Sequence, residues 1–137
     1  MEPKKVGFVD AIKLFFSNYA NFSGRSRRSE YWWIVLFNFI VQLVTYSPAY
    51  YMLMSAAAQS QEPSVLAYLL MGIYGLFALA TLVPGFALIW RRLHDIGKSG
   101  ASFFIFLVPI AGPIILLVWF LKDSDPNENQ YGPNPKA

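Results

Sequence analysis

The chain contains three long segments without a single Asp, Glu, Lys, Arg or His, at residues 31–54, 65–90 and 101–121. A helix rises about 1.5 Å per residue, so about 20 apolar residues cross a hydrocarbon core about 30 Å thick. The remaining residues are too few to enclose three such helices in a soluble protein. The sequence therefore predicts an all-α, polytopic membrane protein with three transmembrane helices, forming a single membrane domain over residues 1–137.

Composition supports this prediction and excludes several kinds of site. The chain is 55% hydrophobic and 14% charged, with a mean hydropathy of +0.39, which is too apolar for a typical soluble domain. It has no cysteine and one histidine, which excludes disulfides, iron–sulfur clusters and a multi-histidine metal site within one subunit. We expect no metal, no cofactor and no nucleic acid partner. The first apolar segment is too long for a cleaved signal peptide, so we expect it to remain as an anchor.

The positive charges are distributed unevenly among the connecting segments. The loop 55–64 contains no Lys or Arg, whereas the loop 91–100 contains Arg91, Arg92 and Lys98. Six more cations precede the first span: Lys4, Lys5, Lys13, Arg25, Arg27 and Arg28. Because cytoplasmic loops carry an excess of Lys and Arg, the N-terminus and the loop 91–100 are predicted to be cytoplasmic.

The third apolar segment is interrupted at its midpoint by Pro109, Gly112 and Pro113. We favour a kinked full span, which would place the polar tail 122–137 outside. The alternative is a re-entrant pair of half-helices, which would return the tail to the cytoplasm; such backbone must be buried in protein to satisfy its polar groups.

An amphipathic helix is predicted over residues 6–20, ahead of the first span. Its apolar residues recur at helical spacing: Phe8, Val9, Ile12, Phe15, Phe16 and Tyr19. Such a helix suits the headgroup layer of an anionic leaflet, and packing on the cytoplasmic end of the bundle is the alternative.

Two short basic segments, 22–33 and 91–100, border the spans. Arg27 and Arg28 fall near the start of a predicted helix, where the helix dipole disfavours cations. A bound anion would resolve this conflict, because free backbone N–H groups and guanidinium groups bind phosphate together. The candidate lipid-phosphate ligands are Arg25, Arg27, Arg28, Arg91, Arg92 and Lys98. Alternatively, the arginines only set topology and extend to the interface.

The second basic segment contains two further motifs. Its Gly-Lys-Ser sequence at 97–99 lacks the upstream glycine and the β-strand of a phosphate-binding P-loop. His94 and Asp95 are adjacent, so on a helix their side chains point in different directions, which favours structural roles. We expect Asp95 to pair with a nearby arginine, and Gly97 and Gly100 to form a tight turn.

The first span carries a polar stripe, Asn38, Gln42 and Thr45, on one helical face. Such stripes usually pack helices together or build a homo-oligomer through hydrogen bonds of roughly 0.6–2 kcal/mol each. A polar transport path is the alternative, although no charged residue lies within any span to form a relay.

Several motifs together resemble one family. They are Phe22, Gly24, Arg25, Arg28, Glu30, Tyr31 and Trp32; the loop Arg91-Arg-Leu-His-Asp with Ser99; the Pro109–Gly112 break; and the tail motif with Asn129, Tyr131 and Gly132. This pattern is similar to that of the YhaH/YhaI-like small bacterial inner-membrane proteins, a family defined by domain of unknown function 805. The resemblance implies a multi-pass protein of the bacterial inner (cytoplasmic) membrane and supplies no catalytic residue.

Three functional hypotheses follow. The first is a non-enzymatic membrane protein whose cytoplasmic rim, chiefly Arg25, Arg28, Arg91 and Arg92, binds anionic phospholipid headgroups and, as a further option, a membrane-protein partner. The second is an oligomeric transporter or channel subunit for small solutes. The third is a lipid-headgroup enzyme, which would depend on His94 and Asp95.

Overall fold

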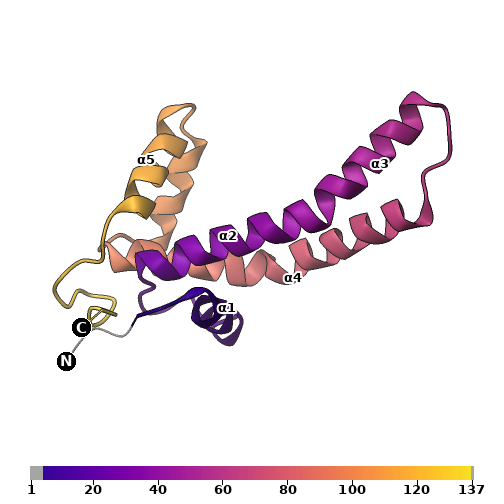
Figure 1. Cartoon of the computed structure of the whole chain (residues 1–137). Helices are drawn as coiled ribbons and strands as arrows, with labels where there is room; N and C mark the ends of the chain where they lie inside the picture. Colours follow the sequence, from indigo (N-terminus) through magenta and orange to yellow (C-terminus); the bar gives the residue numbers. More distant parts are fainter. Residues whose placement is uncertain (1–4, 137) are drawn as a thin grey trace. The chain divides into compact units, whose positions relative to one another are not determined.

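The computed structural model describes residues 5–136, and Lys4, counted above among the N-terminal cations, lies outside this range. Within it the chain is helical, apart from turns and one isolated bridge between Asn129 and Gly132. The elements, coloured along the sequence in Figure 1, are α1 (Phe8–Ser17), α2 (Arg28–Val44), α3 (Tyr46–Ala58), α4 (Val65–Asp95), the 3₁₀ helix η1 (Gly100–Leu107) and α5 (Ala111–Leu121). The predicted all-α class is confirmed.

The described residues divide into two compact units, one formed by 5–34 with 83–136 and one by 35–82. We call them unit 1 and unit 2. The single domain expected over 1–137 stays a prediction.

Unit 2 contains most of α2, all of α3 and the first part of α4. Aromatic pairs join its helices: Phe37 lies against Phe77, with ring centroids 5.6 Å apart, and Tyr46 against Tyr74 at 5.1 Å. The break between α2 and α3 falls at Thr45, whose hydroxyl donates to the Val41 carbonyl at 2.7 Å. Pro48 follows in the first turn of α3, where its missing N–H costs no helical hydrogen bond.

Within residues 5–136, two helical runs are long and apolar enough to cross a membrane. Arg28–Ala58, which combines α2 and α3, and Val65–Asp95 each contain 31 residues. They include the predicted spans 31–54 and 65–90. The second run extends beyond its predicted end at residue 90. The first part of the predicted loop 91–100, up to Asp95, therefore forms the last turn of α4.

The third apolar segment forms two short helices instead of the favoured kinked span. Helix α5 has 11 residues and is about 16 Å long, too short to cross a bilayer alone. The segment turns at 108–110, and α5 packs back on η1 (Figure 1): a Cβ at Gly112 would lie 2.0 Å from the Ile105 carbonyl oxygen. Pro109 and Pro113 lack the N–H groups that a continuous helix would use.

Both ends of this hairpin lie at the end of α4. Gly100 is so close to the Trp90 ring that an added Cβ would come within 1.9 Å of it. At the other end, Arg92 donates to the Phe120 carbonyl at 3.1 Å. The segment 101–121 thus forms a helical hairpin that returns to the end of α4, as in the re-entrant alternative, and the number of membrane spans stays a prediction.

Helix α1 is shorter than the predicted 6–20 and packs against other helices of unit 1. Its buried residues Ala11 and Phe15 form a cluster with Ile34 and Leu88. One face of α1 therefore packs against the first part of α2 and the last part of α4. Packing on the bundle was the alternative considered for this helix. Its location in the headgroup layer stays a prediction.

Candidate functional site

The last turn of α4 presents four polar side chains to the rest of unit 1. The helix ends in a Schellman motif, in which Lys98 N–H donates to the Leu93 carbonyl at 2.9 Å and Gly97 N–H to the His94 carbonyl at 3.0 Å. Gly97 has a φ of +79°, which favours glycine. Arg91, Arg92, His94 and Asp95 lie in the last turns of α4, directly before this motif.

Asp95 lies at the centre of a buried cluster of charges. Its carboxylate is 3.0 Å from Arg25 Nε and 3.2 Å from Arg92 Nη1. It also accepts a hydrogen bond from the Ser124 hydroxyl at 2.6 Å. The side chains of Asp95 and Arg92 are 0% exposed and that of Arg25 is 1% exposed. We call these four residues, Arg25, Arg92, Asp95 and Ser124, the Arg–Asp cluster.

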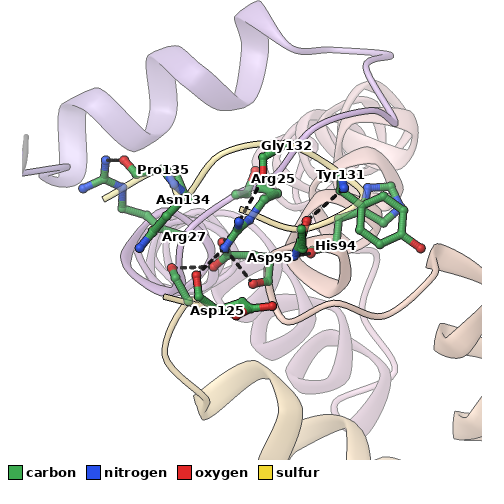
Figure 2. Close-up of polar contacts among 12 residues, drawn as sticks. Arg25, Arg27, His94, Asp95, Asp125, Tyr131, Gly132, Asn134 and Pro135 are labelled. Atoms are coloured by element: carbon green, nitrogen blue, oxygen red, sulfur yellow. Dashed lines mark hydrogen bonds and ion pairs between the residues drawn. The ribbon is translucent and has the colours of Figure 1, made fainter. Parts of the chain in front are cut away.

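Arg25 also holds the tail in place through backbone carbonyls (Figure 2). Its Nη2 donates to the Asp125 carbonyl at 2.7 Å and to that of Asp95 at 3.1 Å. Its Nη1 donates to the carbonyls of Asn127 and Gly132, at 3.0 and 3.1 Å. One guanidinium group therefore joins the end of α4 to two turns of the tail.

The carbonyls at the end of α5 have side-chain donors. Arg92 donates to Phe120 and Lys122, Arg28 to Leu121 at 3.0 Å, and Trp32 Nε1 to Phe120 at 2.9 Å. Tyr31 stacks on the Phe120 ring at 4.5 Å. Because the last carbonyls of a helix have no partner within it, these contacts anchor α5 to α2 and α4.

His94 has a structural environment in unit 1. Its Nδ1 is 3.0 Å from the Gly24 carbonyl oxygen, and its ring lies parallel to that of Tyr131 at 3.9 Å. Its own carbonyl accepts a hydrogen bond from the Asn129 amide at 3.0 Å. Asp95 is fully buried in the Arg–Asp cluster, so the two residues do not form an acid–base pair facing an open site.

Arg91 occupies a second buried position. Its Nε donates to the Ser26 hydroxyl at 2.9 Å, and its Nη1 to the carbonyls of Asn18 and Asn21, at 3.2 and 2.6 Å. Its Nη2 is 3.8 Å from a Glu30 carboxylate oxygen. Within residues 5–136 this buried nitrogen has no hydrogen-bond partner.

A cavity of about 500 Å³ borders Arg91 and α1 in unit 1. We call it the α1 pocket. Its charged lining residues are Asp10, Lys13, Arg25, Arg27, Glu30 and Arg91. Four cations and two carboxylates thus meet there, and Lys13 is exposed at the surface of α1.

The structure separates the six candidate phosphate ligands into two groups. Arg25, Arg27 and Arg91 line the α1 pocket. The other three lie elsewhere: Arg28 on the α5 terminus, Arg92 in the Arg–Asp cluster, and Lys98 Nζ 4.5 Å from the centre of the Trp119 ring. Lys13, which also lines the pocket, was not among the residues predicted from the sequence, although it stands between apolar residues in the predicted helix 6–20.

Two further contacts lie outside the Arg–Asp cluster and the α1 pocket. The Ser99 hydroxyl is 3.3 Å from that of Ser102 at the start of η1. In the tail, Lys136 forms an ion pair with Asp123. This pair and the Ser124 N–H lower the pKa of the Asp123 carboxyl. Both partners are at least 31% exposed, so the pair contributes little stability.

Comparison with known proteins finds a family that this chain matches. The family described as "Protein of unknown function (DUF805)" matches residues 19–133. The Escherichia coli K12 inner membrane protein YhaI is 40% identical over 119 residues, which cover 87% of this chain and 89% of YhaI. Inner membrane protein YhaH of the same strain is 35% identical, covering 87% of this chain and 90% of YhaH. No solved structure matches. The matched region contains α2–α5 and the tail motif, and begins after α1.

Proposed function

The chain belongs to the DUF805 family, and on that premise we propose that it binds the phosphate of anionic phospholipid headgroups in the α1 pocket. We further propose a non-enzymatic, multi-pass protein of the bacterial inner membrane, with α1, the end of α4 and the tail on the cytoplasmic side. The names of the relatives support an inner-membrane location, and the distribution of Lys and Arg supports this orientation.

One observation carries the lipid proposal: more cations than carboxylates line the α1 pocket, and one of these cations, Arg91, has a buried Nη2 that is paired with Glu30 at 3.8 Å but makes no hydrogen bond within residues 5–136. Arg91 is 3% exposed, and its Nη2 has no hydrogen-bond partner among the described residues. An unsatisfied buried donor is costly. A phosphate oxygen is a strong acceptor that guanidinium groups prefer.

The surface of α1 supports a lipid as the source of that phosphate. Val9 and Phe16 are 61% and 43% exposed on the helix that carries Lys13. An exposed apolar residue next to a lysine suits the boundary between acyl chains and headgroups. A lipid would place its phosphate beside Lys13 and Arg91 while its acyl chains contact the apolar residues.

The burial of Arg25 and Arg92 narrows the expected ligand set. Arg25 is saturated by Asp95 and by backbone carbonyls, and Arg92, whose Nε has no hydrogen-bond partner within residues 5–136, lies outside the α1 pocket. The proposed ligands are therefore Lys13, Arg27 and Arg91, with Arg25 and Arg92 maintaining the shape of unit 1.

The test is native mass spectrometry of the detergent-purified protein, comparing wild type with Lys13→Glu at matched delipidation. Lys13 is exposed, so its substitution leaves the buried packing intact. We expect wild type to retain phosphatidylglycerol and Lys13→Glu to retain several-fold less. Lys122→Glu introduces the same charge change at an exposed position outside the pocket and should behave as wild type.

Equal lipid retention by wild type and Lys13→Glu would refute the proposal, and so would the absence of anionic lipid from both. Loss of bound lipid on addition of inorganic phosphate alone would show that the pocket recognises free phosphate.

A further inference from the structure

Two amide side chains on α2 have no hydrogen-bond partner among residues 5–136. Asn38 and Gln42 are one helical turn apart, and both are exposed. Neither side chain makes a hydrogen bond within the part of the chain that the structure describes. All other side chains between Ile34 and Val44 are apolar.

The threonine hydroxyl groups of the same spans differ from these amides. Thr45 donates to the Val41 carbonyl at 2.7 Å, and Thr81 to the Phe77 carbonyl at 2.8 Å. Each threonine is therefore satisfied by its own helix. An exposed amide carries two donors and an acceptor that its helix does not satisfy.

The position of the two amides raises the free-energy cost of leaving them without hydrogen-bond partners. Both lie well inside the apolar run Arg28–Ala58, and their neighbours Val35, Phe39 and Leu43 are 38%, 54% and 50% exposed. In the proposed membrane-spanning protein such a face would be directed at lipid, which offers no hydrogen-bond partner in the hydrocarbon core. The adjacent Phe37 is already packed on Phe77.

We propose that this chain self-associates in the membrane, with Asn38 and Gln42 of α2 hydrogen-bonding to the same residues of a second copy. An amide is self-complementary, since its N–H₂ group donates to the carbonyl of an identical amide. A two-fold axis brings identical residues together, so amides one turn apart supply two sets of bonds in one interface. The interface is formed by unit 2 and does not depend on the α1 pocket.

The experiment compares the full-length wild type with Asn38→Leu/Gln42→Leu by analytical ultracentrifugation in micelles over a range of protein-to-detergent ratios. Leucine is favoured in a lipid-facing helix, so the variant should fold and insert. We expect a dimer in wild type and a dissociation constant about tenfold higher in the variant. Thr45→Val is the matched control, because its hydroxyl is already bonded within α2, and it should dimerise as wild type.

A wild type that remains monomeric at every ratio would overturn the proposal, because the amides would then serve lipid, water or a different protein. Undiminished association of the double leucine variant would overturn it as well, because another surface would then form the dimer.

Discussion

Asp95 is the residue on which the polar contacts of unit 1 converge. Its carboxylate faces Arg25 and Arg92, and its backbone carbonyl accepts hydrogen bonds from Arg25 and from the Asp125 N–H at 2.9 Å. A buried ion pair gains little over an apolar pair of the same shape, but removing one partner leaves an uncompensated buried charge. The value of Asp95 therefore lies in the single negative charge that it shares between two buried guanidinium groups.

We expect Asp95→Asn to reduce the free energy of unfolding by about 3–5 kcal/mol, the usual cost of breaking a buried ion pair. The measurement is chemical unfolding in mild detergent micelles, followed by tryptophan fluorescence. Glu62→Gln makes the same chemical change at an exposed position and should alter stability little. If Asp95→Asn were as stable as Glu62→Gln, the Arg–Asp cluster would not hold unit 1 together.

At the scale of elements, the hairpin of η1 and α5 depends on a close approach of two backbones. Gly112 faces Ile105 and Phe106, and an added Cβ would lie 2.0 Å from the Ile105 carbonyl oxygen and 2.9 Å from the Phe106 Cα. These are backbone atoms, which cannot move aside as a flexible side chain can. The two short helices can pack this closely only if residue 112 lacks a side chain.

Gly112→Ala is accordingly expected to destabilise the protein by about 1–3 kcal/mol, the typical cost of overpacking. Gly85→Ala, within α4, provides the opposite control, because nothing lies within 4 Å of its added Cβ. Alanine is the better helix former, so this control should gain about 0.5–1 kcal/mol. The measurement is thermal unfolding of both variants in the same micelles. Equal changes in the free energy of unfolding would exclude the close contact between Gly112 and Ile105.

The sequence predicted the helices well because their signal is local. The uncharged runs 31–54 and 65–90 indicated the two long helical runs directly. The Pro109–Gly112 break indicated an interruption, but the choice between a kink and a hairpin depends on the Gly112–Ile105 contact. That contact is a property of the tertiary fold, and no composition or spacing records it.

The arginine contacts were harder to foresee, for a physical reason. Opposite charges at 92 and 95 are near neighbours on a helix, so a pair involving Asp95 was predictable. Arg25, by contrast, binds three carbonyls of the tail. Every residue has a carbonyl, so such acceptors leave no residue-type signal in the sequence.

At the scale of the whole molecule, the contacts of Arg25 constrain membrane topology. Arg25 precedes the first span and binds the tail beside the end of α4, all within unit 1. In the multi-pass protein proposed above, these segments would therefore lie on the same side of the membrane. This placement requires an even number of crossings, which two spans and a re-entrant hairpin supply and three full spans do not.

The most direct test of this topology is single-cysteine labelling with a membrane-impermeant maleimide, because the chain has no native cysteine. Exposed positions are available in each segment: Ala20 before the first span, Gln61 in the loop 55–64, and Glu128 in the tail. In spheroplasts we expect Gln61→Cys to react at once, and Ala20→Cys and Glu128→Cys to react only after permeabilisation. Immediate labelling of Glu128→Cys together with protection of Ala20→Cys would contradict the re-entrant hairpin and restore a third full span.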